Sequence, residues 1–256
     1  MSDAHRLRTQ RAQWAFSILK LSIISEEVII MCNNKLTLKR DFVQLESYPE
    51  VLKIRGMVKK EMSRLVAGKN ASNNLLRGIR WGIRVNDSFQ WTKRNTYSLP
   101  VSLNSEESGK TREFTLISDE FISHPVIQAV LKSKFETWAF SEKSDSRAFE
   151  VQVSLIGYVA TLTSTAFPAP VYLHQDMVDG SVTVLYIDGK VDGGITRVFD
   201  LNEDMIVEAS LGEGESIFMV DEQTKHVVTP ISVGLGSVSG VAKRLLMIVR
   251  FQPVGR

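Results

Sequence analysis

A change of residue pattern at about Ala148 restricts the folds open to this chain more than any other feature. From Phe149 onward, short runs rich in β-branched and aromatic residues alternate with turns marked by glycine and aspartate, such as Asp188-Gly189, a hairpin signal. Regularly spaced short strands of this kind are typical of a β sandwich or barrel. The expected strands are residues 149–153, 155–163, 181–187, 195–199, 216–220 and 245–249.

The front half has helical spacing instead. Residues 47–67 begin with Ser47, a good helix cap, and Pro49, which suits a first turn, and Gly68 is the expected end. Their apolar stripe is predicted to be core and consists of Val51, Ile54, Val58, Met62 and Leu65. Residues 124–135 predict a second helix. Helices in front and strands behind predict an α+β fold, mainly β, with the helices buttressing one sheet.

A length of 256 residues suits one large domain, or one domain with an extension. We expect an N-terminal extension over residues 1–36 and a domain over residues 37–256. Within that domain, the helical front part covers about 47–137 and the barrel core about 148–253. The sequence contains no internal repeat, P-loop or glycine-rich dinucleotide turn.

The single cysteine, Cys32, excludes an internal disulfide framework and a cysteine-rich zinc site. No secretory signal is recognisable. Residues 14–31 are rich in apolar residues, but Lys20, Glu26 and Glu27 interrupt them, so they do not predict a membrane-spanning helix. The expectation is a soluble cytoplasmic protein.

Charge is unevenly distributed along the chain. Residues 1–147 hold 24 Lys and Arg against 16 Asp and Glu, a net charge of +8, while residues 148–256 hold 7 against 13, a net charge of −6. The basic residues of the front half are mixed with acids and lack interleaved aromatics, which favours a solvated helical face over a nucleic-acid surface. The acidic back half suits neither nucleic acid nor an anionic membrane.

One pair of histidines and an aspartate suggest a metal site. His174 and Asp176 follow residues 169–173, a predicted short strand, and side chains two apart on a strand share a face. His226 follows fifty residues later. Two imidazoles and one carboxylate on one side of a metal ion form the facial triad of non-haem Fe(II) oxygenases. By themselves the three residues also fit a turn-capping His174 and a hydrogen-bonded His226 at a strand end.

A metal held on one face has three open positions, of which a 2-oxoacid takes two and dioxygen the third. The far carboxylate of a dicarboxylic 2-oxoacid needs a cation, and the arginine fork matches a carboxylate with two parallel hydrogen bonds. The last predicted strand offers Arg244 and Arg250, which are six residues apart and so share a face. The alternative for each is an ordinary charge at a strand end or on the surface.

Several motifs in a fixed order carry a family resemblance. They are His174-Gln175-Asp176, Asp192-Gly193-Gly194 with Phe199-Asp200, Asp221 with His226-Val227-Val228-Thr229-Pro230-Ile231, and the Arg244 strand. Over about residues 150–253 the chain resembles the bacterial Fe(II)/2-oxoglutarate dioxygenases that hydroxylate free amino acids, the L-isoleucine 4-hydroxylase group.

This resemblance implies a double-stranded β-helix, a jelly-roll or cupin-like barrel with helices packed outside. It implies that His174, Asp176 and His226 bind Fe(II) and that Arg244 binds the distal carboxylate of 2-oxoglutarate, with Arg250 as the second choice. The reaction implied releases succinate and CO2 as an unactivated C–H bond is hydroxylated, with ascorbate as reductant in vitro. The chain departs from the family pattern at Leu245, where an aspartate is usual, and at Met177, where a glycine is frequent.

Two other functions fit the same residues. The two histidines and the carboxylate suit a zinc-dependent hydrolase, for which Asp221 or Glu222 would be the general base. The second alternative is a non-catalytic β-barrel that binds a small ligand.

The implied partners are dioxygen and a free L-amino acid, with an aliphatic side chain such as that of isoleucine, leucine or methionine. The substrate carboxylate needs a cation, and the candidates are Arg77, Arg80, Arg84 and Arg94. No nucleic-acid or membrane partner is expected, and a homo-oligomer is compatible with the pattern.

Overall fold

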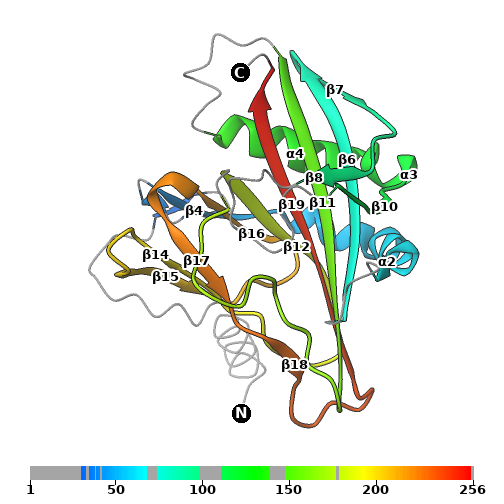
Figure 1. Cartoon of the computed structure of the whole chain (residues 1–256), viewed down its shortest axis with the longest axis vertical. Helices are drawn as coiled ribbons and strands as arrows, with labels where there is room; N and C mark the ends of the chain where they lie inside the picture. The colour runs from blue at the N-terminus through cyan, green and yellow to red at the C-terminus, as the bar shows by residue number, and fades with distance from the viewer. Residues whose placement is uncertain are drawn as a thin grey trace, which may run out of the picture.

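The computed structural model describes residues 30–32, 35–37, 39–40, 42–67, 74–98, 111–138, 148–176 and 179–254, the first three ranges as backbone only. A ten-stranded sheet dominates it, in the order β10-β6-β11-β19-β12-β16-β4-β3, with β5 and β7 paired to β6. Its strands are β3 (Lys39–Arg40), β4 (Val43–Ser47), β5 (Val66–Ala67), β6 (Leu75–Val85), β7 (Ser88–Trp91), β10 (Thr115–Leu116), β11 (Ala148–Thr161), β12 (Gly180–Asp188), β16 (Glu215–Met219) and β19 (Val241–Pro253). The long strands β6, β11 and β19 lie side by side (Figure 1).

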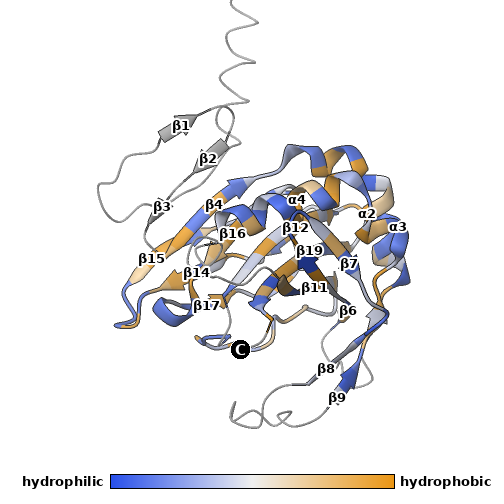
Figure 2. Cartoon of the chain, turned by 90° about the horizontal axis from the view of Figure 1, so that it is seen from above, coloured by the Kyte–Doolittle hydropathy of each residue, from blue (hydrophilic) through white to orange (hydrophobic). Residues whose placement is uncertain are grey.

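Smaller sheets and short helices complete the described part. The paired strands are β1 (Ile30–Cys32) with β2 (Lys35–Thr37), β8 (Thr96–Ser98) with β9 (Thr111–Glu113), β13 (Val191–Gly193) with β18 (Ile231–Val233), and β14 (Thr196–Phe199) with both β15 (Met205–Ala209) and β17 (Lys225–Val228). The helices are η1 (Pro49–Ile54), α2 (Arg55–Arg64), α3 (Asp119–Ile122), α4 (Pro125–Thr137) and η2 (Asp221–Gln223). Helices α2, α3 and α4 lie on one side of the large sheet, here called its outer face, and β14 and β17 on the other, its inner face (Figure 2).

Residue alternation along the strands explains why both faces are covered. On β19, Leu245, Met247 and Val249 belong to an apolar core shared with the helices, whereas Ala242 and Leu246 belong to a second core shared with the smaller sheets. Successive side chains of a strand point to opposite faces, so one strand supplies both cores. Facing sheets with helices outside are the arrangement of a double-stranded β-helix, and the predicted fold class is confirmed.

The two predicted helices are present, with one correction at a boundary. All five stripe residues of the first are buried, as predicted. Its predicted start was wrong, because Ser47 ends β4 and Tyr48 is the N-cap. The 3-10 helix η1, Pro49–Ile54, precedes α2. Ser47 pairs with Glu215 of β16, so sheet pairing takes the place of capping. The expected end at Gly68 lies outside the described residues, and α2 ends at Arg64.

The strand predictions need two corrections. Residues 149–153 and 155–163 were predicted as separate strands, but 148–161 form the single strand β11. The turn at Asp188-Gly189 does not join a hairpin, because β12 pairs with β16 and β19 whereas β13 pairs with β18. Gly189 has a φ of +72°, a left-handed conformation that glycine adopts readily, and there the chain passes from the large sheet to a small one.

The predicted division at residues 36 and 37 falls within β2, and residues 1–29 lie outside the described part, so this division stays a prediction. Among the described residues, no helix has both the length and the apolar character needed to span a membrane.

Candidate metal centre

The segment before His174 is a loop and not the predicted strand. Pro168 and Pro170 have no amide hydrogen to donate to a neighbouring strand, which limits pairing here. An isolated antiparallel β-bridge to His226 fixes the backbone of His174 instead. The amide of His174 donates to the carbonyl of His226 at 3.1 Å, and the amide of His226 donates back at 2.9 Å. Because β17 also pairs with β14, this bridge attaches the loop to the inner sheet.

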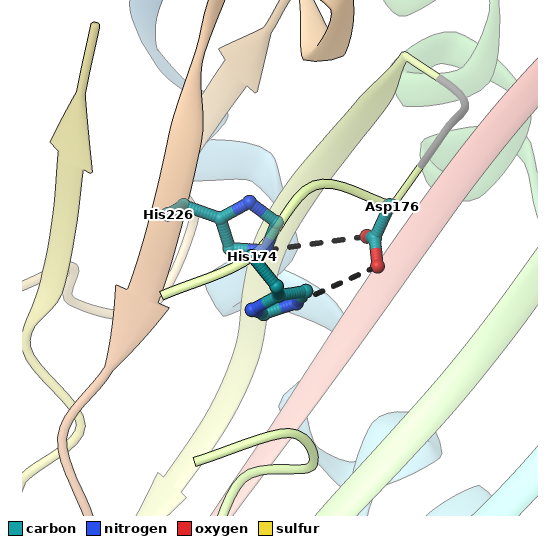
Figure 3. A group of neighbouring side chains, drawn as sticks. All are labelled: His174, Asp176 and His226. Carbon is teal, nitrogen blue, oxygen red and sulfur yellow. Dashed lines mark ion pairs between the residues drawn. The ribbon is translucent and has the colours of Figure 1, made fainter. Parts of the chain in front are cut away.

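The three residues of the predicted triad converge at this bridge (Figure 3). His174, Asp176 and His226 each offer one ligand atom, and these atoms lie within 4.8 Å of one another. The distance from His174 Nε2 to Asp176 Oδ1 is 3.6 Å, and that from His226 Nε2 to Asp176 Oδ2 is 4.0 Å. Two imidazoles and one carboxylate around one point are a donor set suited to a divalent first-row metal with open positions.

The electrostatic surroundings favour the metal-binding form of two of these groups. Burial lowers the pKa of His226 to about 4, which keeps its imidazole neutral at pH 7. Burial works to raise the pKa of Asp176, but the hydrogen bond to His174 and the charge of Arg250 outweigh it and hold this pKa below its usual range. A neutral imidazole and an ionised carboxylate are the forms that ligate metals. For His174, burial works to lower the pKa, but the hydrogen bonds to Asp176 and to the Tyr172 carbonyl raise it.

Neighbouring polar groups fix the position of Asp176. Arg250 Nη2 donates to Asp176 Oδ2 at 3.0 Å, and the amide of Asp176 donates to Asp221 Oδ1 at 2.7 Å. Gln175 Nε2 donates to the carbonyl of Asp221 at 2.6 Å, and the amide of Asp221 donates to Asp179 Oδ1 at 2.9 Å. The sequence suggested Asp221 as one of the motif residues of the family resemblance and as a general base for a zinc enzyme, but not as a partner of the His174-Gln175-Asp176 triplet. Its role in holding the triplet depends on contacts across 45 residues, which no local pattern reveals.

Arg244 lies farther along the inner face and is almost fully buried. Its Nη1 donates to the carbonyl of Gly194 and its Nη2 to that of Leu211, while its Nε has no hydrogen-bond partner in the described structure. Burial lowers the pKa of Arg244 to about 10. A buried guanidinium whose hydrogen bonds to the described residues all go to carbonyls, and which leaves a donor unused, fits an anionic ligand. Tyr158, directly opposite on β11, is also buried at this point.

The structure separates the four arginines considered for the substrate carboxylate. Arg80 and Arg84 face the helices, where Arg80 bonds the Ile117 carbonyl and Arg84 stacks on the Phe135 ring. Arg77 pairs with Ile156, and Ile156 packs against the core on the inner side. Arg94 stacks on Trp81, which is paired with Gln152 on that same inner face. Only Arg77 and Arg94 therefore lie on the side of the metal centre.

Known proteins resemble this chain in sequence and in structure. It is 26% identical to L-isoleucine-4-hydroxylase of Bacillus thuringiensis over 162 residues, which cover 61% of this chain and 65% of that protein. The solved structure of IDO from Bacillus thuringiensis has a TM-score of 0.66 at 20% identity, covering 82% of this chain and 93% of that one. A bsmA homolog from Methylobium petroleophilum PM1 has a TM-score of 0.70 at 18% identity, covering 83% and 89%.

A sequence model of a protein family matches most of this chain. The model of the 2OG-Fe dioxygenases matches residues 60–247, from within α2 to within β19. This stretch contains Arg244 and the three converging residues His174, Asp176 and His226. The chain belongs to the 2OG-Fe dioxygenase family.

Proposed function

We propose that this protein hydroxylates an unactivated C–H bond of a free L-amino acid with an aliphatic side chain, and releases succinate and CO2. The family supplies the reaction type, with Fe(II), 2-oxoglutarate and dioxygen. The amino-acid substrate is supported by the likeness to L-isoleucine-4-hydroxylase. The single observation that carries the proposal is the convergence of two imidazoles and one carboxylate within 4.8 Å on the inner face of a β barrel.

In this proposal His174, Asp176 and His226 hold the iron, which together with 2-oxoglutarate activates dioxygen. The donor set fits, because the Asp176 carboxylate is kept ionised and the His226 imidazole is kept neutral. Arg250 and Asp221 hold Asp176 in place through its carboxylate and its amide. Ligands fixed in this way need little rearrangement when the metal binds.

Arg244 binds the distal carboxylate of 2-oxoglutarate in this proposal. Its unused Nε supports the assignment, since a carboxylate would accept from it and offset the charge buried there. Arg250 is the weaker choice because its guanidinium already bonds to Asp176. The buried surroundings of Arg244 also exclude water, which strengthens an ion pair with the cosubstrate.

The test is succinate formation by the purified protein with Fe(II), ascorbate and 2-oxoglutarate in air, against the twenty amino acids. Succinate that rises with one amino acid, together with a product one oxygen atom heavier, is expected. The His174→Ala variant should form none, and Arg244→Lys should raise the KM for 2-oxoglutarate far more than Arg250→Lys. Succinate formation that no amino acid stimulates would reject the amino-acid substrate and keep the dioxygenase.

A further inference from the structure

An ion pair stacked on an aromatic ring lies on the inner face of the large sheet. Arg94 Nη1 donates to Glu150 Oε1 at 3.1 Å, and the Arg94 guanidinium lies 4.0 Å from the centroid of the Trp81 ring. The Trp81 indole is buried and its N–H donates to the Thr96 carbonyl at 2.9 Å, so the ring is fixed. The side chains of Arg94 and Glu150 remain 50% and 39% exposed, so both charges are accessible to a ligand.

This ion pair is connected to the metal centre by one row of side chains. Trp81, Gln152 and Arg250 pair across β6, β11 and β19, so the three share one face and lie in line. Arg250 is the last residue of the row, and its guanidinium forms an ion pair with Asp176, a proposed metal ligand. Adjacent strands are about 4.8 Å apart, so the β6 and β19 backbones are separated by about 10 Å in this row. Glu150, two residues from Gln152 on β11, faces the same side.

The head group of a free amino acid matches the charges of this pair. An α-amino acid carries a carboxylate and an ammonium on one carbon, and the ion pair offers a guanidinium and a carboxylate at hydrogen-bond distance from each other. When the amino acid lies against the Arg94–Glu150 ion pair, each of the four charges has two neighbours of opposite sign. The arginine fork favours a planar carboxylate. An amine or a carboxylic acid alone satisfies only one half of the pair.

We infer that Arg94 and Glu150 form the subsite for the α-carboxylate and α-ammonium of the substrate, on the Trp81 ring. This assignment rests on the proposed amino-acid hydroxylase. The substrate side chain then points along the row through Gln152 toward Asp176. The subsite selects free amino acids over peptides, because a peptide bond removes one of the two charges.

The test measures KM and kcat with L-isoleucine, L-leucine and L-methionine for Arg94→Gln and Glu150→Gln. A lost charge-assisted contact to the head group raises KM about tenfold or more. It leaves kcat within about twofold, because the contact is made equally before and during reaction. The KM for 2-oxoglutarate stays at the wild-type value. Wild-type protein should prefer L-isoleucine strongly over 3-methylpentanoic acid, which lacks the ammonium, and Glu150→Gln should narrow that preference.

The outer face provides a matched control. Arg55 bonds to Glu213 at 3.1 Å and stacks on the Tyr186 ring at 4.5 Å, the same arrangement away from the metal centre. Arg55→Gln and Glu213→Gln should leave every KM unchanged. Wild-type turnover of an amino acid with unchanged KM in both Arg94→Gln and Glu150→Gln would overturn the subsite alone. Absence of amino-acid-stimulated succinate in the wild type would overturn the proposed function and the subsite with it.

Discussion

At the scale of single residues, the contact between Arg250 and Asp176 orients the Asp176 carboxylate relative to the proposed metal position. Arg250 Nη2 lies 3.0 Å from Oδ2, which leaves Oδ1 facing His174. The guanidinium also reduces the negative charge of the site. We therefore assign Arg250 a positioning role that differs from that of Arg244, whose hydrogen bonds to the described residues all go to backbone carbonyls.

We predict that Arg250→Met weakens metal binding by about 10–100-fold, the usual effect of removing a hydrogen-bond partner from a metal ligand. Arg250→Lys keeps a hydrogen-bond donor for Asp176 and should recover part of the affinity. The measurement is a Co(II) titration followed by visible absorption, without 2-oxoglutarate or oxygen. The Arg55→Gln variant serves as control, and equal Co(II) affinity in Arg250→Met and wild type would contradict this role.

Lys134 is a second residue whose environment has a measurable effect. Its ammonium is completely buried on the outer face, where it donates to Ser216 Oγ at 2.6 Å and to Ser181 Oγ. Burial lowers the pKa of Lys134 to about 7, although the nearby charge of Glu46 works to raise it. Because the pKa is 10.5 in the unfolded chain, that chain binds more protons than the folded one between pH 7 and pH 10.5.

The free energy of unfolding should therefore rise with pH above about pH 7, by at most about 1.4 kcal/mol per pH unit from this group. The Lys134→Met variant lacks this contribution, so its curve should be flatter between pH 7 and pH 9. Urea unfolding at several pH values measures both curves. Parallel curves would show that Lys134 does not titrate in this range.

At the scale of elements, the turn between β13 and β14 positions Arg244, the residue that we propose binds 2-oxoglutarate. Gly194 has a φ of +68°, and its carbonyl accepts from Arg244. A Cβ atom built on Gly194 would lie 1.9 Å from Arg244 Nη1. The turn is thus compatible with Arg244 only when residue 194 has no side chain.

We predict that Gly194→Ala destabilises the fold by more than about 1 kcal/mol, through backbone strain and displacement of Arg244. It should also raise the KM for 2-oxoglutarate. Gly56→Ala in α2 is the matched control, since its Cβ would meet no atom within 4 Å and alanine favours helix. Thermal unfolding and 2-oxoglutarate titration measure the two effects, and a Gly194→Ala variant as stable as Gly56→Ala would refute the first.

At the scale of the whole molecule, residue patterns predicted the layers better than the connections. The stripe from Val51 to Leu65 and the strand around Met247 are buried as expected, because 3.6-residue and two-residue periods report directly on which face meets a core. The Asp188-Gly189 turn was wrong as a hairpin, because pairing partners depend on the whole barrel. The three triad residues were found through local spacing and resemblance. Asp221 and Glu150 acquire their contacts only through long-range pairing.

The three proposed ligand residues come from two segments that meet only in the folded barrel, so metal binding should stabilise the whole molecule. A metal ion at one hundred times its dissociation constant adds about 2.7 kcal/mol to the free energy of unfolding. For a chain of this size, that corresponds to a rise in Tm of about 5–10 °C. Differential scanning calorimetry with Mn(II) measures it. The His174→Ala variant should show no rise, and a rise of the same size in that variant would place the metal elsewhere.

The reciprocal bridge between His174 and His226 has a consequence for isotope exchange. Each amide donates to the carbonyl of the other residue, so neither proton reaches solvent until the same two-bond rung opens. Their protection factors, which correct for the intrinsic exchange rate of each amide, should thus be equal, although 52 positions separate them in the chain. A metal that ties the two rings together would slow both amides by the same factor. Hydrogen exchange of these two amides therefore measures metal occupancy of the site without substrate or turnover.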